Sequence, residues 1–290
     1  MRLGALVLQE QPWRELRHTW QLLERLGFDA GYAADHLTHA HVAGRWWADG
    51  WTTLAAAAGV TSRLRLGTLV ASSAVRSPTV LARNAATLQD LTDGRFVLGL
   101  GAGLPADARA DRGAVLDNAQ LWARHDETVS AVRALWLGSS SWSGRVVSVD
   151  GVLPAAHAPG RLPPPIVLAA GGRKGFDLAA RQGDGWVTFG PGVAGMRPAE
   201  WWAAVERQSR EITAACQRIG RDPASIDRRL LVGWGEVRPL VSSEAFREAL
   251  GRAESAGFHE MVIYAPSGQP GDRFWADPDA FAAAVSSVVA

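Results

Sequence analysis

The sequence predicts a single α/β domain over residues 1–290, folded as a (β/α)8 TIM barrel. Short runs rich in Leu, Val and Ala alternate with longer amphipathic runs from one end of the chain to the other. This alternation is typical of parallel strands joined by helices. The two kinds of run occur in equal number, eight of each, and barrels of this kind commonly reach this length as one domain.

The predicted strands are short and apolar, and turn residues follow most of them. They are Leu3–Leu8, Ala30–Ala34, Leu64–Val70, Arg95–Leu100, Ile166–Ala169, Gly185–Thr188, Arg229–Trp234 and Met261–Ala265.

The predicted helices carry apolar side chains three or four positions apart, as Leu16, Trp20 and Leu23 do in the first. They cover residues 12–27, 51–60, 78–91, 126–138, 174–183, 199–220, 243–257 and 278–289. Residues 138–165 break the alternation, because they are rich in turn residues and contain one short β-like piece, RVVSVDG. We expect an inserted loop or hairpin there.

Composition limits the partners. The net charge is +1 and no long run of one sign occurs, so neither nucleic acid nor a membrane surface is expected as a partner. A small molecule is the expected partner. Cys216 is the single cysteine, no run is apolar for long enough to span a bilayer, and the N-terminus lacks a secretory cleavage pattern. These features predict a cytoplasmic protein.

The active site of such a barrel lies where its strands end at their carboxyl side. Asp35 and His36 directly follow the second predicted strand, and His36 is the one histidine at a predicted strand end. A histidine titrates near neutral pH and suits proton transfer, although a surface loop residue fits the position equally well. A metal site built from Asp35, His36, His39 and His41 is disfavoured, because no other strand end supplies a histidine ligand.

Two glycine-rich stretches follow strands, LGLGAG at 98–103 and AAGG at 169–172. Glycine lets backbone N–H groups approach an anion, and Arg173 and Lys174 beside the second stretch favour a phosphate. Each motif alone is weak, since a barrel strand also needs glycine simply to turn.

Tryptophans cluster after His36, and Trp234 ends the seventh predicted strand. Four of them, Trp46, Trp47, Trp51 and Trp234, are candidates for the wall of a pocket around a planar ring, with packing in the core or between subunits as the alternative.

Four segments in this order resemble the luciferase-like flavin or deazaflavin oxidoreductase superfamily. They are LGFDAGYAADH, RLRLGTLVASSAVRSPTVLARNAATLQDLTDGRFVLGLGAG, PIVLAAGGRKGFDLAARQGDGWV and AGFHEMVIYAP. The Asp-His strand end and the tryptophan-bearing loop after it are most similar to the branch that uses coenzyme F420, a deazaflavin that transfers hydride.

The resemblance implies roles for residues in this chain. His36 would transfer a proton near the deazaflavin ring and Asp35 would lie beside the cofactor. Leu69 and Val70 would form a bulge with a non-proline cis peptide behind the ring, and Ser72 would point toward it. The residues that would hold the cofactor's tail and phosphate are Ala102, Gly103, Asp107, Gly171, Gly172, Lys174 and Gly175.

The chain also departs from the sugar-phosphate dehydrogenase branch. That branch has a glutamate where this chain has Leu104, followed by Pro105, and it has substrate-binding lysines, whereas Lys174 is the only lysine here. We therefore do not expect glucose 6-phosphate as a substrate. Glu236, beyond the seventh strand, is a candidate replacement acid, with a solvated loop carboxylate as the alternative.

These observations predict an F420-dependent oxidoreductase that reduces an activated C=C or C=N bond or interconverts an alcohol and a carbonyl. The alternative is an FMN-dependent monooxygenase that uses reduced flavin and oxygen, and a third possibility is a flavin-binding protein without catalysis. A homodimer is expected, and no metal.

Overall fold

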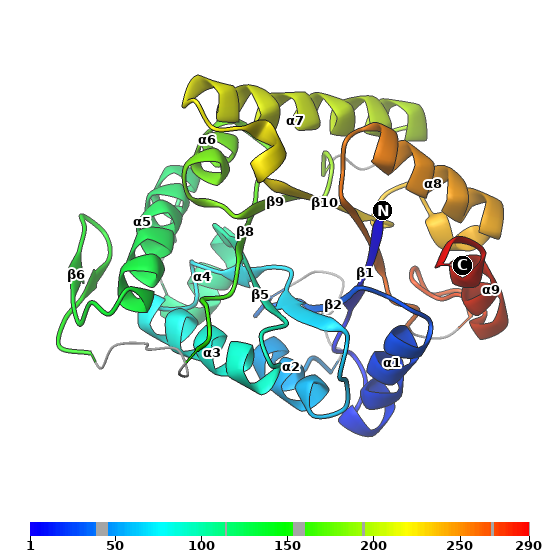
Figure 1. The fold of residues 1–290 in the computed structure, drawn as a ribbon, viewed down its shortest axis with the longest axis horizontal. Helices are drawn as coiled ribbons and strands as arrows, with labels where there is room; N and C mark the ends of the chain where they lie inside the picture. The colour runs from blue at the N-terminus through cyan, green and yellow to red at the C-terminus, as the bar shows by residue number, and fades with distance from the viewer. Residues whose placement is uncertain (39–45, 114, 153–159, 193–194, 268–269, 290) are drawn as a thin grey trace.

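The computed structural model is a closed barrel of parallel strands ringed by helices (Figure 1). It describes the chain except residues 39–45, 114, 153–159, 193–194, 268–269 and 290. In order around the barrel the strands are β3 (Arg65–Thr68), β2 (Ala30–Ala33), β1 (Arg2–Val7), β11 (Glu260–Tyr264), β10 (Asp227–Val232), β9 (Gly185–Thr188), β8 (Ile166–Ala169) and β5 (Phe96–Gly101). Pairing of β3 with β5 closes the ring, so the predicted (β/α)8 fold is confirmed.

Two apolar layers hold the barrel together. Side chains that alternate along the strands fill the interior, where Leu6, Tyr32 and Val262 are buried. A larger layer lies between the strands and the helices and includes Trp20, Leu98 and Trp186, each fully buried.

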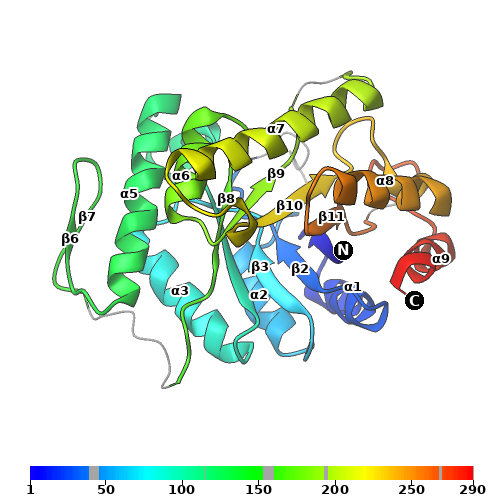
Figure 2. The same ribbon diagram turned by 45° about the horizontal axis from the view of Figure 1, so that its top comes forward.

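The helices form the outer ring, and each predicted helix is present. They are α1 (Trp13–Arg25), α2 (Gly50–Ala58), α3 (Pro78–Leu91), α5 (Asn118–Trp136), α6 (Arg173–Gln182), α7 (Pro198–Arg218), α8 (Ser243–Ser255) and α9 (Pro278–Val289). The last helix lies beside the first part of the chain, where Phe281 stacks on Phe28 with ring centroids 6.1 Å apart. Figure 2 shows α9 beside α1 and α8.

One helix was not expected from the sequence. Helix α4 (Pro105–Arg112) follows β5 and begins with a proline, which fits the first turn of a helix. Its residues are short or charged, PADARADR, so the apolar spacing that reveals the other helices is missing.

The third predicted strand, Leu64–Val70, is divided in the structure. It ends at Thr68, the peptide between Leu69 and Val70 is cis, and β4 (Ala71–Ser72) resumes the pairing with β5. Glycines in β5 permit this close approach. A Cβ on Gly99 would lie 2.0 Å from the carbonyl oxygen of Thr68, and one on Gly101 would lie 2.8 Å from Cγ2 of Val70.

The seventh predicted strand ends earlier than expected. Strand β10 stops at Val232, because Gly233 adopts φ +119°, a conformation that side-chain-bearing residues rarely enter. Trp234 therefore lies in the loop beyond the strand.

The predicted insertion contains a hairpin, as expected. Strands β6 (Trp142–Ser143) and β7 (Ser148–Val149) pair antiparallel beside α5 (Figures 1 and 2). The Glu127 carboxylate on α5 accepts hydrogen bonds from the backbone N–H groups of Arg145, Val146 and Val147, at 2.8–3.0 Å. Among the described helices, none has both the length and the apolar composition needed to cross a bilayer.

Candidate active site

The carboxyl ends of the parallel strands all open on one mouth of the barrel, the C-terminal mouth, so residues that follow different strands meet there. His36 follows β2 and Asp107 lies in the first turn of α4, after β5. The Nδ1 atom of His36 lies 3.1 Å from Oδ2 of Asp107. This pair joins two segments that are 71 residues apart in the chain.

Asp107 is completely buried, and its carboxylate binds the two residues that follow His36 as well as His36 itself. Oδ1 accepts hydrogen bonds from the backbone N–H of Leu37 at 3.2 Å, and from the N–H and the hydroxyl of Thr38 at 2.7 and 2.9 Å. The carboxylate also lies at the N-terminus of a helix, where the dipole favours negative charge. These contacts fix the His36 ring relative to the barrel.

The charge on Asp107 decides which tautomer of His36 is present. Burial opposes ionisation, but hydrogen bonds from His36 and Thr38 outweigh it and hold the pKa of Asp107 below its usual value. An ionised carboxylate only accepts hydrogen bonds, so Nδ1 of His36 carries the proton and donates it. The Nε2 atom of this tautomer carries a lone pair and is a hydrogen-bond acceptor.

Asp35 is bound on all sides by protein groups. Its carboxylate receives two hydrogen bonds from the guanidinium of Arg76, from Nε at 3.2 Å and from Nη2 at 2.7 Å. The indole N–H of Trp51 donates at 3.2 Å and the backbone N–H of Ser72 at 3.4 Å. Asp35 therefore ties the end of β2 to β4 beside His36.

Ser72 supplies a polar group that the described part of the chain leaves unpaired. Its Oγ is buried and has no hydrogen-bond partner. Gly103 faces it with φ +87°, and a Cβ there would lie 2.3 Å from that Oγ. A buried hydroxyl without a partner is costly in a folded protein, so Ser72 is suited to a ligand that enters the mouth. Leu69 and Val70 pack against the barrel interior just before it.

The second glycine stretch forms an open helix terminus. Gly172 caps the N-terminus of α6 with no side-chain hydrogen bond, and a Cβ on it would meet nothing within 4 Å. Gly171, Gly172 and Lys174 are exposed. Gly175 has a packing role, since a Cβ there would lie 2.6 Å from both Ala170 and Trp122. The free N–H groups at this terminus fit a phosphate.

Aromatic side chains line part of the C-terminal mouth. Tyr264 and Phe274 stack with centroids 4.1 Å apart, and Trp234 lies 5.9 and 5.7 Å from them. Trp47 is half-buried and packs against the barrel interior. Trp46 has its side chain 66% exposed, so its place in a pocket stays a prediction.

The other residues considered from the sequence also follow strands that open on this mouth. Ala102 is half-buried after β5, and Leu104 is 41% exposed at the start of α4. Glu236 is exposed in the loop after β10. His39 and His41 fall outside the described residues, and the described ones contain no His, Cys, Asp and Glu group that could hold a metal ion.

Sequence reasoning missed three groups near this mouth. Arg76 binds Asp35 and Thr38 binds Asp107, and the sequence pattern predicted neither contact. His125 on α5 is completely buried and lies 2.8 Å, Nδ1 to Oγ, from Ser73. Burial lowers the pKa of His125 to about 4, so it is neutral at physiological pH. No sequence signal distinguishes such a packed histidine from an exposed one.

The closed ring of parallel strands and the polar groups at its C-terminal mouth define the chain as a (β/α)8-barrel protein. Its family follows from its similarity to known proteins. The family described as luciferase-like monooxygenase matches residues 1–233, and the chain belongs to it. The F420-dependent hydroxymycolic acid dehydrogenase of Mycobacterium tuberculosis is 32% identical over 241 residues, which cover 78% of this chain and 60% of that protein. The F420-dependent glucose-6-phosphate dehydrogenase of Beutenbergia cavernae is 33% identical over 207 residues, covering 66% of this chain and 58% of that one. These matches therefore span about three fifths of each relative's length.

Solved structures share the fold at lower identity. An F420-dependent secondary alcohol dehydrogenase in complex with an F420-acetone adduct superposes with a TM-score of 0.78 at 18% identity, covering 91% of this chain and 92% of that one. The EDTA monooxygenase of Chelativorans sp. BNC1 superposes with a TM-score of 0.75 at 18% identity, covering 100% and 92%. The same barrel thus occurs in deazaflavin-dependent and in monooxygenase proteins.

Proposed function

We propose that this chain is an oxidoreductase that uses coenzyme F420 to transfer a hydride to or from a small organic substrate, with His36 as the proton partner. The observation that carries the proposal is the His36–Asp107 pair at the C-terminal mouth. Relatives at 32% and 33% identity are named as F420-dependent dehydrogenases, which supports the choice of cofactor.

The chain's residues suit the two ends of such a cofactor. The uncapped N-terminus of α6 with Gly171, Gly172 and Lys174 would hold a phosphate, and Ala102 and Gly103 would border the tail. Ser72 Oγ, Leu69 and Val70 would face the ring at the mouth, and Trp47 and Trp234 would help to exclude water. When bound, F420 would supply or accept the hydride.

His36 would move the proton that accompanies the hydride. A carbonyl that receives a hydride on carbon needs a proton on oxygen. His36 would give this proton from Nε2 when its ring is the imidazolium, protonated on both nitrogens, and would be left neutral with the Nδ1 proton still directed at Asp107. In the reverse direction the same atom would accept the proton of a hydroxyl. We propose that Asp107 acts as a positioning residue, since it fixes the ring and its tautomer. This replaces the role in binding the cofactor's tail that the resemblance implies for Asp107.

Glucose 6-phosphate is a poor candidate substrate for this chain. Leu104 stands where the sugar-phosphate branch carries a glutamate, and a single lysine, Lys174, is present in the whole sequence. A substrate without a phosphate fits better, with an alcohol, a carbonyl or an activated C=C or C=N bond. Glu236 stays a candidate second acid, from an exposed position.

The second candidate function is an FMN-dependent monooxygenase, favoured by the family's description and by the shared fold of the EDTA monooxygenase. Titration of purified protein with F420 and with FMN separates the two, followed by turnover with and without oxygen. We expect F420 binding and turnover that does not need oxygen. Tight FMN binding without affinity for F420 would overturn the proposal, and binding without any turnover would leave a flavin-binding protein.

We further propose that residues 1–290 work as one cytoplasmic domain that forms a homodimer. Trp13 and Trp275 expose 37% and 39% of their surface, and exposed aromatic side chains favour contacts between subunits. Light scattering during size-exclusion chromatography tests this, and a monomer mass would contradict it.

A further inference from the structure

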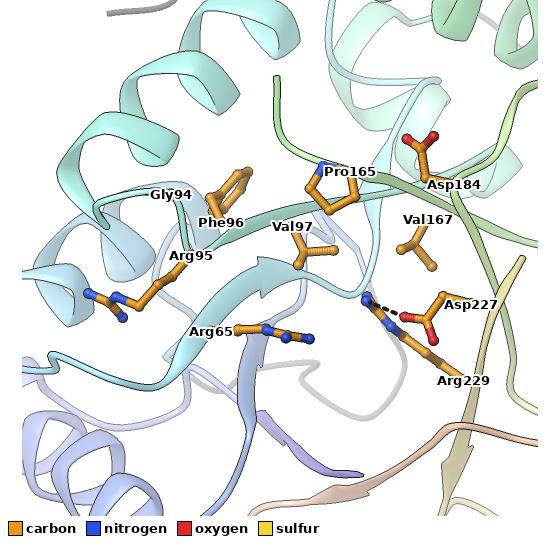
Figure 3. A pocket seen from close by; sticks show the side chains of 10 residues that line it. All are labelled: Arg65, Gly94, Arg95, Phe96, Val97, Pro165, Val167, Asp184, Asp227 and Arg229. Atoms are coloured by element: carbon orange, nitrogen blue, oxygen red, sulfur yellow. Dashed lines mark hydrogen bonds and ion pairs between the residues drawn. The ribbon is translucent and has the colours of Figure 1, made fainter. Parts of the chain in front are cut away.

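A second opening lies at the amino ends of the barrel strands, the N-terminal mouth, at the opposite end of the barrel from the His36–Asp107 pair. It is a cavity of about 300 Å³ between the starts of β3, β5, β8, β9 and β10 (Figure 3). Apolar side chains, among them Val97, Val167 and Pro165, form one part of its wall, and three arginines and two aspartates form another.

Arg229 brings an incompletely paired cation to this cavity. Its side chain is only 3% exposed. Nη2 donates to Asp227 at 3.0 Å, and Nε lies 3.4 Å from Oε2 of Glu260, in ion-pair range but without hydrogen-bond geometry. Nη1 is buried and has no partner. A buried guanidinium N–H that lacks an acceptor costs free energy, so an acceptor in the cavity would satisfy it.

Arg65 faces Arg229 from the opposite wall. Figure 3 shows the two guanidinium groups pointing toward one another across the cavity. Within the described residues, the side chain of Arg65 makes no hydrogen bond or ion pair. Two cations that face each other repel, unless an anion lies between them.

The nearby carboxylates are already used by other groups. Asp184 accepts hydrogen bonds from Arg133 at 3.0 Å and from the backbone N–H of Ile166 at 2.8 Å. Asp227 also binds Arg2, and His259 lies 3.2 Å from its Oδ1. The third arginine of the wall, Arg95, donates to backbone carbonyls outside the cavity. The unmatched charge of this mouth is therefore positive and is centred between Arg65 and Arg229.

We propose that the N-terminal mouth binds a small phosphate-type oxyanion between Arg65 and Arg229. Guanidinium groups suit phosphate oxygens, because they offer paired N–H donors in a fixed plane. The apolar wall of Val97, Val167 and Pro165 leaves room for a small apolar substituent, so a compact organic phosphate fits better than inorganic phosphate. This site is separate from the glycine stretch at α6 and does not depend on the proposed oxidoreductase activity.

Calorimetric titration at constant ionic strength tests the proposal, with inorganic phosphate and phenyl phosphate as probes. The variants are Arg65→Gln, the matched control Arg63→Gln on the exposed surface nearby, and Lys174→Gln at the other mouth. We expect saturable binding of phenyl phosphate that Arg65→Gln weakens about tenfold or more. Arg63→Gln and Lys174→Gln should keep the site.

Several outcomes would overturn the proposal. They are equal binding to Arg65→Gln and to the unmodified chain, loss of binding only in Lys174→Gln, and no binding of either probe. The melting temperature without added anion is a check on folding. We expect Arg65→Gln to melt no lower than the unmodified chain, because the substitution removes one of two facing cations. If Arg65→Gln melts lower than the unmodified chain, phenyl phosphate is added to both proteins and the two rises in melting temperature are compared. A rise equal to that of the unmodified chain also overturns the proposal.

Discussion

The two mouths of the barrel use charge in opposite ways. At the N-terminal mouth, Arg2, Arg229, Asp227 and Glu260 bind mainly one another. At the C-terminal mouth, Asp107 binds a histidine and a loop, and the Ser72 hydroxyl has no partner in the described chain. Charges that neutralise one another stabilise a barrel, whereas polar groups held beside an opening can act on a ligand. The contrast predicts that substitutions in the ion-pair group of Arg2, Arg229, Asp227 and Glu260 affect stability, and that substitutions at His36 and Asp107 affect turnover.

The largest expected effect is at His36. His36→Ala should keep cofactor binding but lower turnover by about 10²- to 10⁴-fold, the usual contribution of a positioned acid or base. Steady-state kinetics with a cofactor titration measures both quantities. His18, an exposed histidine on α1, supplies the matched control, and His18→Ala should change neither. Unchanged turnover in His36→Ala would remove its assigned role.

The reverse pattern is expected at the N-terminal mouth. Glu260 is fully buried and accepts a hydrogen bond from Tyr32 at 2.6 Å, with Arg2 and Arg229 at ion-pair distance. Glu260→Gln removes one of the two carboxylates that pair with these arginines and leaves them to share Asp227, so it should lower the free energy of unfolding by about 3 kcal/mol. Urea unfolding measures this loss, while turnover per folded molecule should stay the same. A stable variant with reduced turnover would contradict the contrast between the mouths.

Acid should weaken the wall behind the C-terminal mouth through His125. Burial lowers the pKa of His125 from 6.5 to about 4, so the unfolded chain takes up a proton between these values and the folded chain does not. The contribution to stability is therefore complete above pH 6.5 and falls as the pH drops, by up to about 3 kcal/mol at pH 4. Unfolding at several pH values measures the slope, and in His125→Gln this slope should shrink. An equal slope in both proteins would exclude His125 as its source.

A smaller loss of turnover is expected at Asp107. Asp107→Asn keeps the size of the side chain but can present an N–H group to Nδ1 of His36. The ring then no longer needs its proton on Nδ1, and turnover should fall about tenfold to a hundredfold. A structural role alone would not change the pH profile of turnover, whereas a positioning role should shift it. Asp107→Glu should recover part of the activity. An unaltered pH profile in Asp107→Asn would reject the positioning role.

The smallest effect is expected at Glu236. Its side chain is exposed in the loop after β10, so Glu236→Gln should change turnover less than about twofold. A tenfold loss would instead identify Glu236 as the acid that replaces the glutamate absent at Leu104.

Periodicity in the sequence predicted much of the fold, because each strand and each of the eight predicted helices buries a continuous apolar stripe. It failed at α4, whose short and charged residues bury little, and at the end of β10, where one glycine conformation decides the boundary. Strand-end position identified His36 as a candidate, yet the partnership with Asp107 was not predictable. The contact joins the segment after β2 to the first turn of α4, 71 residues further along the chain, and no local pattern encodes it.

Arg76 has a consequence for how this barrel can diversify. Its guanidinium bridges Asp35 at the end of β2 and Asp49, which in turn caps α2. The backbone N–H of Ala48 also donates to the carbonyl of Gln9, at 3.0 Å. The segment that follows His36 therefore begins and ends at points attached to the barrel itself. An exchange of sequence between these two attached points should therefore leave the strands in their register.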